Sequence, residues 1–157
     1  MHQFSDWLSA TAFSQAIQVT SWAIPGIQTV HIAALATLFA CALVLALRFA
    51  GRGLVAEPLH QLAARFVPAI WLLLLVLLVS GALLITAEPG RTITNPVFYL
   101  KMIMLALVAA ITLWLGRAAR RELERPSSLH VFAAALTIVL WAGIIVAGRF
   151  IAYVESY

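Results

Sequence analysis

Four long apolar runs, separated by short polar segments, dominate the pattern of hydrophobic and polar positions along the chain. They cover residues 27–47, 66–87, 97–115 and 129–154. A helix rises about 1.5 Å per residue and needs about 20 apolar residues to cross about 30 Å of hydrocarbon. Backbone groups in lipid must be hydrogen-bonded internally, so runs this long are helices rather than barrel strands. The pattern predicts an all-α fold, an integral membrane four-helix bundle, in a single transmembrane domain over residues 1–157.

The segment before the first run, residues 1–22, mixes apolar and polar side chains. It has no lysine or arginine, and Asp6 interrupts its apolar part, so we do not expect a cleaved signal peptide. Apolar side chains such as Trp7 and Phe13 among polar ones predict a short amphipathic helix on the outer membrane interface, with Trp22 as an anchor. The alternative is a polar cap on the end of the bundle.

Composition excludes several classes of protein. Of 157 residues, 64% are hydrophobic and 10% charged, and the mean hydropathy is +1.02. A soluble domain carries about 25% charged residues, so a disordered tail, a disulfide-rich secreted module and an ordinary soluble enzyme are excluded. The net charge of +4 comes from basic residues that flank the apolar runs, where they meet lipid headgroups. We therefore expect a lipid bilayer as the partner, and no nucleic acid.

The basic residues are unevenly distributed among the segments between the runs. The first 47 residues contain no lysine or arginine, whereas many arginines follow the first and third runs: Arg48, Arg52, Arg65, Arg117, Arg120, Arg121 and Arg125. Between the second and third runs lies only Arg91. Positive residues stay in the cytoplasm, so the pattern predicts a multi-pass protein of a bacterial inner membrane with both termini in the periplasm.

Three ionisable side chains lie inside the predicted spans at one depth. His31, Lys101 and Arg149 are each five residues inside the expected outer boundary, which is roughly 7–8 Å. Such groups are costly in lipid, so they predict an outward-facing pocket of positive potential that suits carboxylates, haem propionates or a quinone oxygen. The alternatives are that Lys101 and Arg149 extend to the headgroups and that His31 is a neutral side chain bonded to a neighbouring helix. Glu88 and Glu155 lie just above this level, and Glu88 can instead neutralise the cluster.

Met104 follows Lys101 by three residues and shares its helix face. It is a candidate to oppose His31 as an axial ligand of haem or as a copper ligand, although methionine in a membrane core is more often filler. The candidate cofactor-binding residues are thus His31, Lys101, Arg149 and Met104, with His31 as the candidate metal ligand. His60 and His130 offer a weaker haem site at the cytoplasmic side, because their predicted levels differ.

Three segments carry a resemblance to known proteins. The stretch from His31 to Arg48, the sequence Asn95–Lys101 (NPVFYLK), and the ending Gly148–Tyr153 (GRFIAY) resemble an uncharacterised bacterial family of small four-helix inner-membrane proteins. The likeness covers most of the chain and implies no activity. A looser likeness, carried by His31 and Lys101, is to the copper resistance D family and to HemJ-type protoporphyrinogen oxidases. The Tyr-Leu-Pro-Arg segment of HemJ and the extra helices of the copper family are absent here.

These features favour a membrane redox subunit that binds haem b, quinone or both at an outer-leaflet site. It would exchange electrons with a periplasmic redox protein. One alternative is a permease or copper-handling protein without redox chemistry, in which His31, Met104 and Cys41 pass copper in sequence. Another is a structural or assembly subunit, or a homo-oligomer, in which the cluster pairs internally. No hydrolase, nucleotide-binding or structural zinc motif occurs in the sequence.

Overall fold

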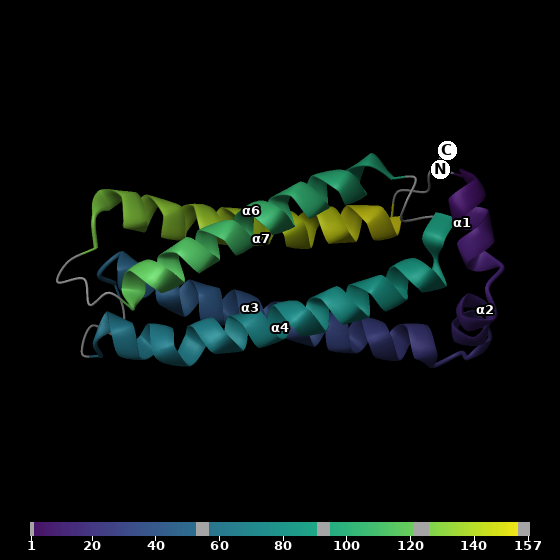
Figure 1. Ribbon diagram of the computed structural model, residues 1–157, viewed down its shortest axis with the longest axis horizontal. Coiled ribbons are helices and arrows are strands. Elements are labelled where there is room, and N and C mark those ends of the chain that lie inside the picture. Colours follow the sequence, from purple (N-terminus) through teal and green to yellow (C-terminus); the bar gives the residue numbers. More distant parts are fainter. Residues whose placement is uncertain (1, 53–56, 91–94, 121–125, 154–157) are drawn as a thin grey trace.

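Four long helices run side by side in alternating directions, and two short helices lie across one end of them (Figure 1). The computed structural model describes residues 2–52, 57–90, 95–120 and 126–153. In chain order the helices are α1 (His2–Ser9), α2 (Ala12–Val19), α3 (Ala23–Phe49), α4 (Leu59–Ala87), α6 (Pro96–Ala119) and α7 (Ser128–Tyr153). We call the end that carries α1 and α2 the α2 end.

The four long helices confirm the predicted all-α membrane bundle. They contain 27, 29, 24 and 26 residues, and each is long and apolar enough to cross a membrane. At about 1.5 Å per residue they measure roughly 36 to 44 Å, more than the hydrocarbon layer requires. The predicted end of the last span, Val154, lies outside the described residues.

The helices extend beyond the apolar runs because their outer turns are amphipathic. The clearest case is α4, which begins at Leu59, seven residues before the predicted start of its span. Leu62 and Ala63 in this extension are buried, whereas Arg65 is exposed. Pro68 lies well inside this helix. The extension buries its apolar face against the bundle. Its other face is polar, so this part of the helix does not have to lie in lipid.

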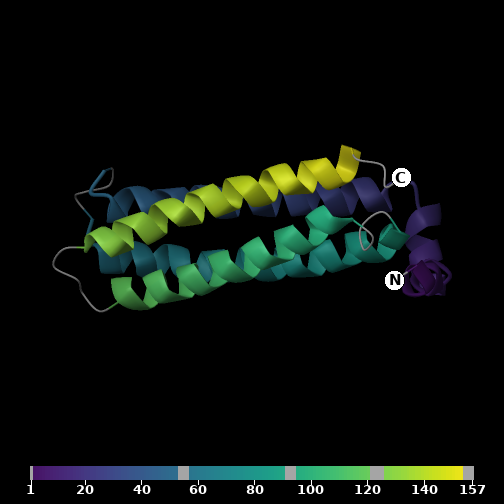
Figure 2. The same cartoon turned by 90° about the horizontal axis from the view of Figure 1, so that it is seen from above.

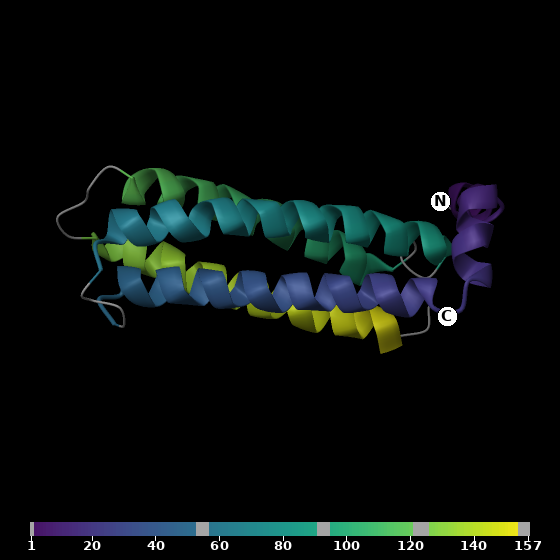
Figure 3. The ribbon, with the colours of Figure 1, turned by 90° about the horizontal axis from the view of Figure 1, so that it is seen from below.

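The bundle consists of two helical hairpins. α3 packs against α4, as Figure 3 shows along their length, and α6 packs against α7. The hairpins join mainly along α3 and α7, and α4 contacts α6 less. α4 and α6 are close at Gly116, where an added Cβ would lie 3.2 Å from Val67 Cγ1. In Figure 1 α6 runs obliquely across α7 and moves away from α4 towards the α2 end, whereas in Figure 2 α6 and α7 slope together, so the packing of α4 and α6 is uneven along the bundle.

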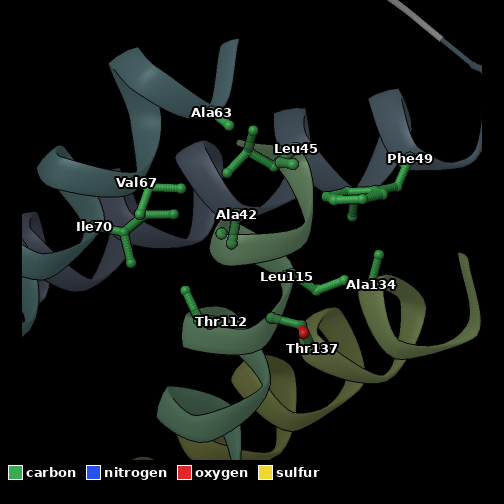
Figure 4. A pocket seen from close by; sticks show the side chains of 13 residues that line it. Ala42, Leu45, Phe49, Ala63, Val67, Ile70, Thr112, Leu115, Ala134 and Thr137 are labelled. Carbon is green, nitrogen blue, oxygen red and sulfur yellow. The ribbon is translucent and has the colours of Figure 1, made fainter. Parts of the chain in front are cut away.

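Each long helix contributes a fully buried side chain to the core: Leu38, Ile70, Val108 and Trp141. Trp141 is the largest of them. Towards the end opposite α2, the core contains a cavity of about 30 Å³ (Figure 4), lined by apolar side chains and by Thr112 and Thr137. Thr137 donates its hydroxyl proton to the carbonyl of Ala133, in its own helix. A cavity of this size holds about one water molecule.

Five arginines among the described residues gather at the end opposite α2: Arg48, Arg52, Arg65, Arg117 and Arg120. We call it the arginine end. The chain leaves α3 here through Gly51, whose positive φ of 67° favours glycine, and the N–H of Arg52 donates to the carbonyl of Leu47. Arg91, Arg121 and Arg125 lie outside the described residues.

The N-terminal segment forms two short helices, where a single one was predicted. The chain breaks after Ser9, and Thr11 caps α2 by accepting a hydrogen bond from the N–H of Ser14. The side chains of α2 then bind the end of α4: Ser14 Oγ donates to the carbonyl of Thr86 at 2.7 Å, and Gln18 Nε2 donates to that of Ala87 at 2.8 Å. The segment therefore covers the end of α4.

Large apolar side chains of this segment remain on the surface. Trp7, Phe13, Val19 and Trp22 are between 58% and 84% exposed. The segment thus makes the hydrogen bonds expected of a polar cap on the bundle. It also has the exposed apolar side chains expected of a helix at the membrane interface.

We expect Ser14→Ala to loosen α1 and α2 without unfolding the bundle. Ser14 is fully buried, and its hydroxyl bonds both α4 and Gln18. Loss of these two bonds, at about 1 kcal/mol each, costs about 2 kcal/mol, which corresponds to roughly 30-fold faster amide exchange in α2. Hydrogen exchange measured by mass spectrometry checks this. Ser9→Ala, which removes only an exposed bond to Asp6 within α1, serves as the control and should change nothing in α2.

Candidate functional site

His31 and Ser80 form a polar pair between α3 and α4. Ser80 is buried, and its Oγ lies 2.7 Å from His31 Nδ1 and 2.6 Å from the carbonyl oxygen of Val76. Two oxygens this close need a proton between them, so the Ser80 hydroxyl donates to Val76. The single hydroxyl proton is then used, and His31 Nδ1–H must be the donor to Ser80. This tautomer leaves a lone pair on His31 Nε2.

Gly81 provides the room for this imidazole. A Cβ added to Gly81 would lie 3.5 Å from His31 Cε1, which is ordinary van der Waals contact. A longer side chain at this position would collide with the ring. Ser80 therefore accepts a hydrogen bond from His31, and Gly81 leaves the space in which the imidazole ring packs against α4.

Lys101 reaches the same region from α6. Its side chain is half-buried, and Nζ lies 3.6 Å from where a Cβ of Gly148 would stand on α7. It is also close enough to His31 for its charge to act on the imidazole. Residues of all four long helices thus meet at one level near the α2 end. We call His31, Ser80 and Lys101 the polar cluster.

Arg149 follows Gly148 and so shares the level of Lys101, as predicted from depth. Its side chain is exposed, because one residue along a helix turns the direction by about 100°. Glu88, at the end of α4, is exposed as well. Glu155 lies outside the described residues. The structure therefore brings His31 and Lys101 together and leaves Arg149 on the surface near them.

Met104 packs against α7. Its Sδ lies 3.2 Å from where a Cβ of Gly143 would stand, so the thioether fills the notch that this glycine leaves. Met104 also packs against the buried core. These contacts favour its interpretation as filler of an irregular gap.

The histidines at the arginine end have separate surroundings. His130 stacks between Trp114, at a centroid distance of 4.8 Å, and Phe49, at 6.2 Å. Its Nδ1 accepts a hydrogen bond from the N–H of Ser127 at the start of α7. His60 is the second residue of α4. Over the described part of the chain, no three His, Cys, Asp or Glu side chains are grouped as ligands of one metal ion.

Sequence reasoning missed Ser80 and Gly81, the two residues of α4 that contact His31. One signal was present: Ser80 and Gly81 interrupt a continuous run of leucine and valine over residues 72–79. Ser80 also lies seven residues before the end of α4, at about the depth of His31 in the antiparallel α3. A small polar residue opposite a histidine at equal depth is a recognisable pair.

Comparisons with protein-family models, with curated proteins and with solved structures find no match to this chain. The fold defines it as a four-helix membrane bundle with a polar cluster in one half.

Proposed function

We propose that this protein is a membrane redox subunit that binds a quinone at the polar cluster and exchanges electrons with a periplasmic partner. The observation that carries the proposal is the His31 tautomer fixed by Ser80. It leaves the basic Nε2 free of the Ser80 bond, with the ammonium group of Lys101 within electrostatic reach. A proton acceptor and a cation at membrane depth suit a lipid-soluble molecule with two oxygen atoms.

The chemistry follows from these two groups. Oxidation of a quinol to a quinone releases two protons and two electrons. His31 Nε2 takes one proton from a quinol hydroxyl, and the second proton passes to water at the α2 end. Lys101 stabilises the negative charge that develops on the other oxygen. The electrons pass singly to two molecules of a periplasmic one-electron carrier protein, and the reverse sequence reduces a quinone.

Haem b at the same histidine is the second candidate. A ligating histidine usually donates its other ring N–H to a fixed acceptor, as His31 does to Ser80. Lys101 and Arg149 would then meet the propionates. The proposed opposite ligand, Met104, is packed against Gly143, so a haem would be held by His31 alone. This favours quinone over haem.

The orientation is part of the proposal. We infer that the arginine end lies in the cytoplasm of a bacterial cell and that the α2 end faces the periplasm. Support comes from the five arginines that gather at one end of the bundle. The polar cluster then lies in the outer leaflet, within reach of a periplasmic protein.

The proposal is tested with purified protein in lipid nanodiscs. Titration with ubiquinone-2 should quench tryptophan fluorescence saturably, and a visible spectrum should be recorded before and after dithionite. Absence of saturable quenching would overturn the quinone site. A Soret band that shifts on reduction and disappears in His31→Ala would replace the quinone by haem. A featureless spectrum together with no quinone binding would favour the structural role.

The two cationic side chains near the site, those of Lys101 and Arg149, should contribute unequally to quinone affinity. We expect Lys101→Ala to raise the Kd for ubiquinone-2 by roughly 10- to 100-fold, since hydrogen bonds to charged groups contribute about 1.5–3 kcal/mol. Arg149→Ala should have a smaller effect, because its side chain is exposed. Arg120→Ala, at the arginine end, is the matched control and should leave the Kd unchanged. Equal Kd values in all three variants would contradict a site at the polar cluster.

A further inference from the structure

A groove runs along the outside of the α3–α4 hairpin near the α2 end. Its volume is about 780 Å³, within the range of about 300–1,000 Å³ typical of small-molecule sites. Gly26 and Val30 of α3, with Trp22 just before this helix, form one wall, and Val79 and Ser80 of α4 belong to the other. Trp22, Val30 and Val79 are more than half exposed, so the groove opens towards lipid. Apart from Ser80, every lining residue is glycine or apolar.

The groove and the polar cluster share Ser80. Its hydroxyl, which lines the groove, is the acceptor that holds His31 Nδ1–H. His31 lies one turn beyond Ile27, another lining residue, on the same face of α3. The groove and the polar cluster therefore meet at Ser80, between α3 and α4.

A membrane quinone has a long isoprenoid tail that must lie somewhere. The cavity towards the arginine end has a volume of about 30 Å³, far too little for a tail. We propose that the groove holds the isoprenoid tail of the quinone and that the ring lies at Ser80, where the groove meets the polar cluster. This inference rests on the proposed function and adds the part of the substrate that the protein recognises.

A phospholipid is a poorer occupant of the groove. Ser80 lies seven residues before the end of α4, which is about 10 Å below that end. A phospholipid keeps its polar headgroup at the membrane interface and has no group to place beside a hydroxyl at this depth. A quinone carries its polar ring on the tail and can bring it to this level.

The test uses two variants that fill the groove, one on α4 and one on α3. It compares their binding of quinones with and without a tail. Val79→Phe fills the groove, and Val146→Phe on α7 is the matched control, because both valines are 53% exposed and only Val79 lines the groove. Gly26→Leu fills it from α3, away from Ser80; a Cβ there meets only Trp22, at 3.9 Å. The Kd is measured by fluorescence quenching in nanodiscs with ubiquinone-2 and with tail-less ubiquinone-0.

We expect Val79→Phe and Gly26→Leu to weaken ubiquinone-2 binding about tenfold and to leave ubiquinone-0 binding unchanged. Val146→Phe should bind both quinones with the wild-type Kd. Because each quinone partitions into the nanodisc lipid equally for all variants, the comparison between variants corrects for this partitioning. If neither filled variant weakens ubiquinone-2 binding, or if both weaken the two quinones equally, the groove does not hold the tail. Wild-type binding of the quinones would then still support the proposed function. Failure of the wild type to bind any quinone would overturn both proposals.

Discussion

His31→Ala is expected to lower quinol oxidation by at least about 100-fold, the lower range for loss of a general base. The variant removes the Nε2 that we propose takes the quinol proton, and no other described histidine lies at this end of the bundle except His2 of α1. Turnover is measured in nanodiscs with ubiquinol-2 as donor and cytochrome c as one-electron acceptor, two molecules reduced per quinol.

Two further variants separate the role of His31 from loss of structure. Ser80→Ala keeps the imidazole but removes the acceptor that fixes its tautomer, so we expect about a tenfold fall in kcat with little change in KM. His60→Ala makes the same side-chain change at the arginine end and should retain full turnover. Equal turnover in the His31 and His60 variants would refute a proton-accepting role for His31.

Trp141→Ala is expected to cause the largest loss of stability. Trp141 is the largest fully buried side chain of the described core, and truncation of such a residue costs about 3–5 kcal/mol. In a membrane this loss comes mainly from dispersion contacts rather than from water, because lipid is as apolar as the core. Reversible unfolding in mixed detergent micelles measures it. Trp71→Ala, on a side chain that is 38% exposed, should cost much less.

Trp141→Phe should behave differently from Trp141→Ala. Among the described residues no acceptor lies within hydrogen-bond distance of Trp141 Nε1, which is buried. Phenylalanine removes this unpaired N–H and keeps most of the ring, so the relief offsets part of the lost volume. We expect a net cost below about 1.5 kcal/mol. A cost equal to that of alanine would mean that the indole N–H is hydrogen-bonded in the membrane.

The spans were predictable because the thickness of the bilayer fixes how long an apolar run must be. The ends of the helices were not predictable in this way, because the part of a helix outside the hydrocarbon needs only one apolar face. The α4 extension from Leu59 illustrates this, with buried Leu62 beside exposed Gln61. The break between α1 and α2 at Thr11 was also missed, because a threonine cap gives no signal in hydrophobicity alone.

At the candidate site, the depth of each side chain along its helix was predictable from the sequence, but the direction in which it points was not. The fixed rise of a helix placed His31, Lys101 and Arg149 at one level. Which side of a helix faces a neighbour depends on packing between helices, and so Arg149 is exposed whereas Lys101 lies against Gly148. Ser80 was overlooked for the same reason, since a serine in an apolar run becomes significant only when its partner across the helices is known.

The pairing of the hairpins has a consequence for how the protein is made. Of the four spans, α3 is synthesised first and α7 last, and these two pack against each other. His31 and Ser80 belong to the first hairpin, and Lys101 belongs to the second. Neither hairpin alone holds the complete cluster. The polar cluster is therefore complete only when the later hairpin packs against the earlier one.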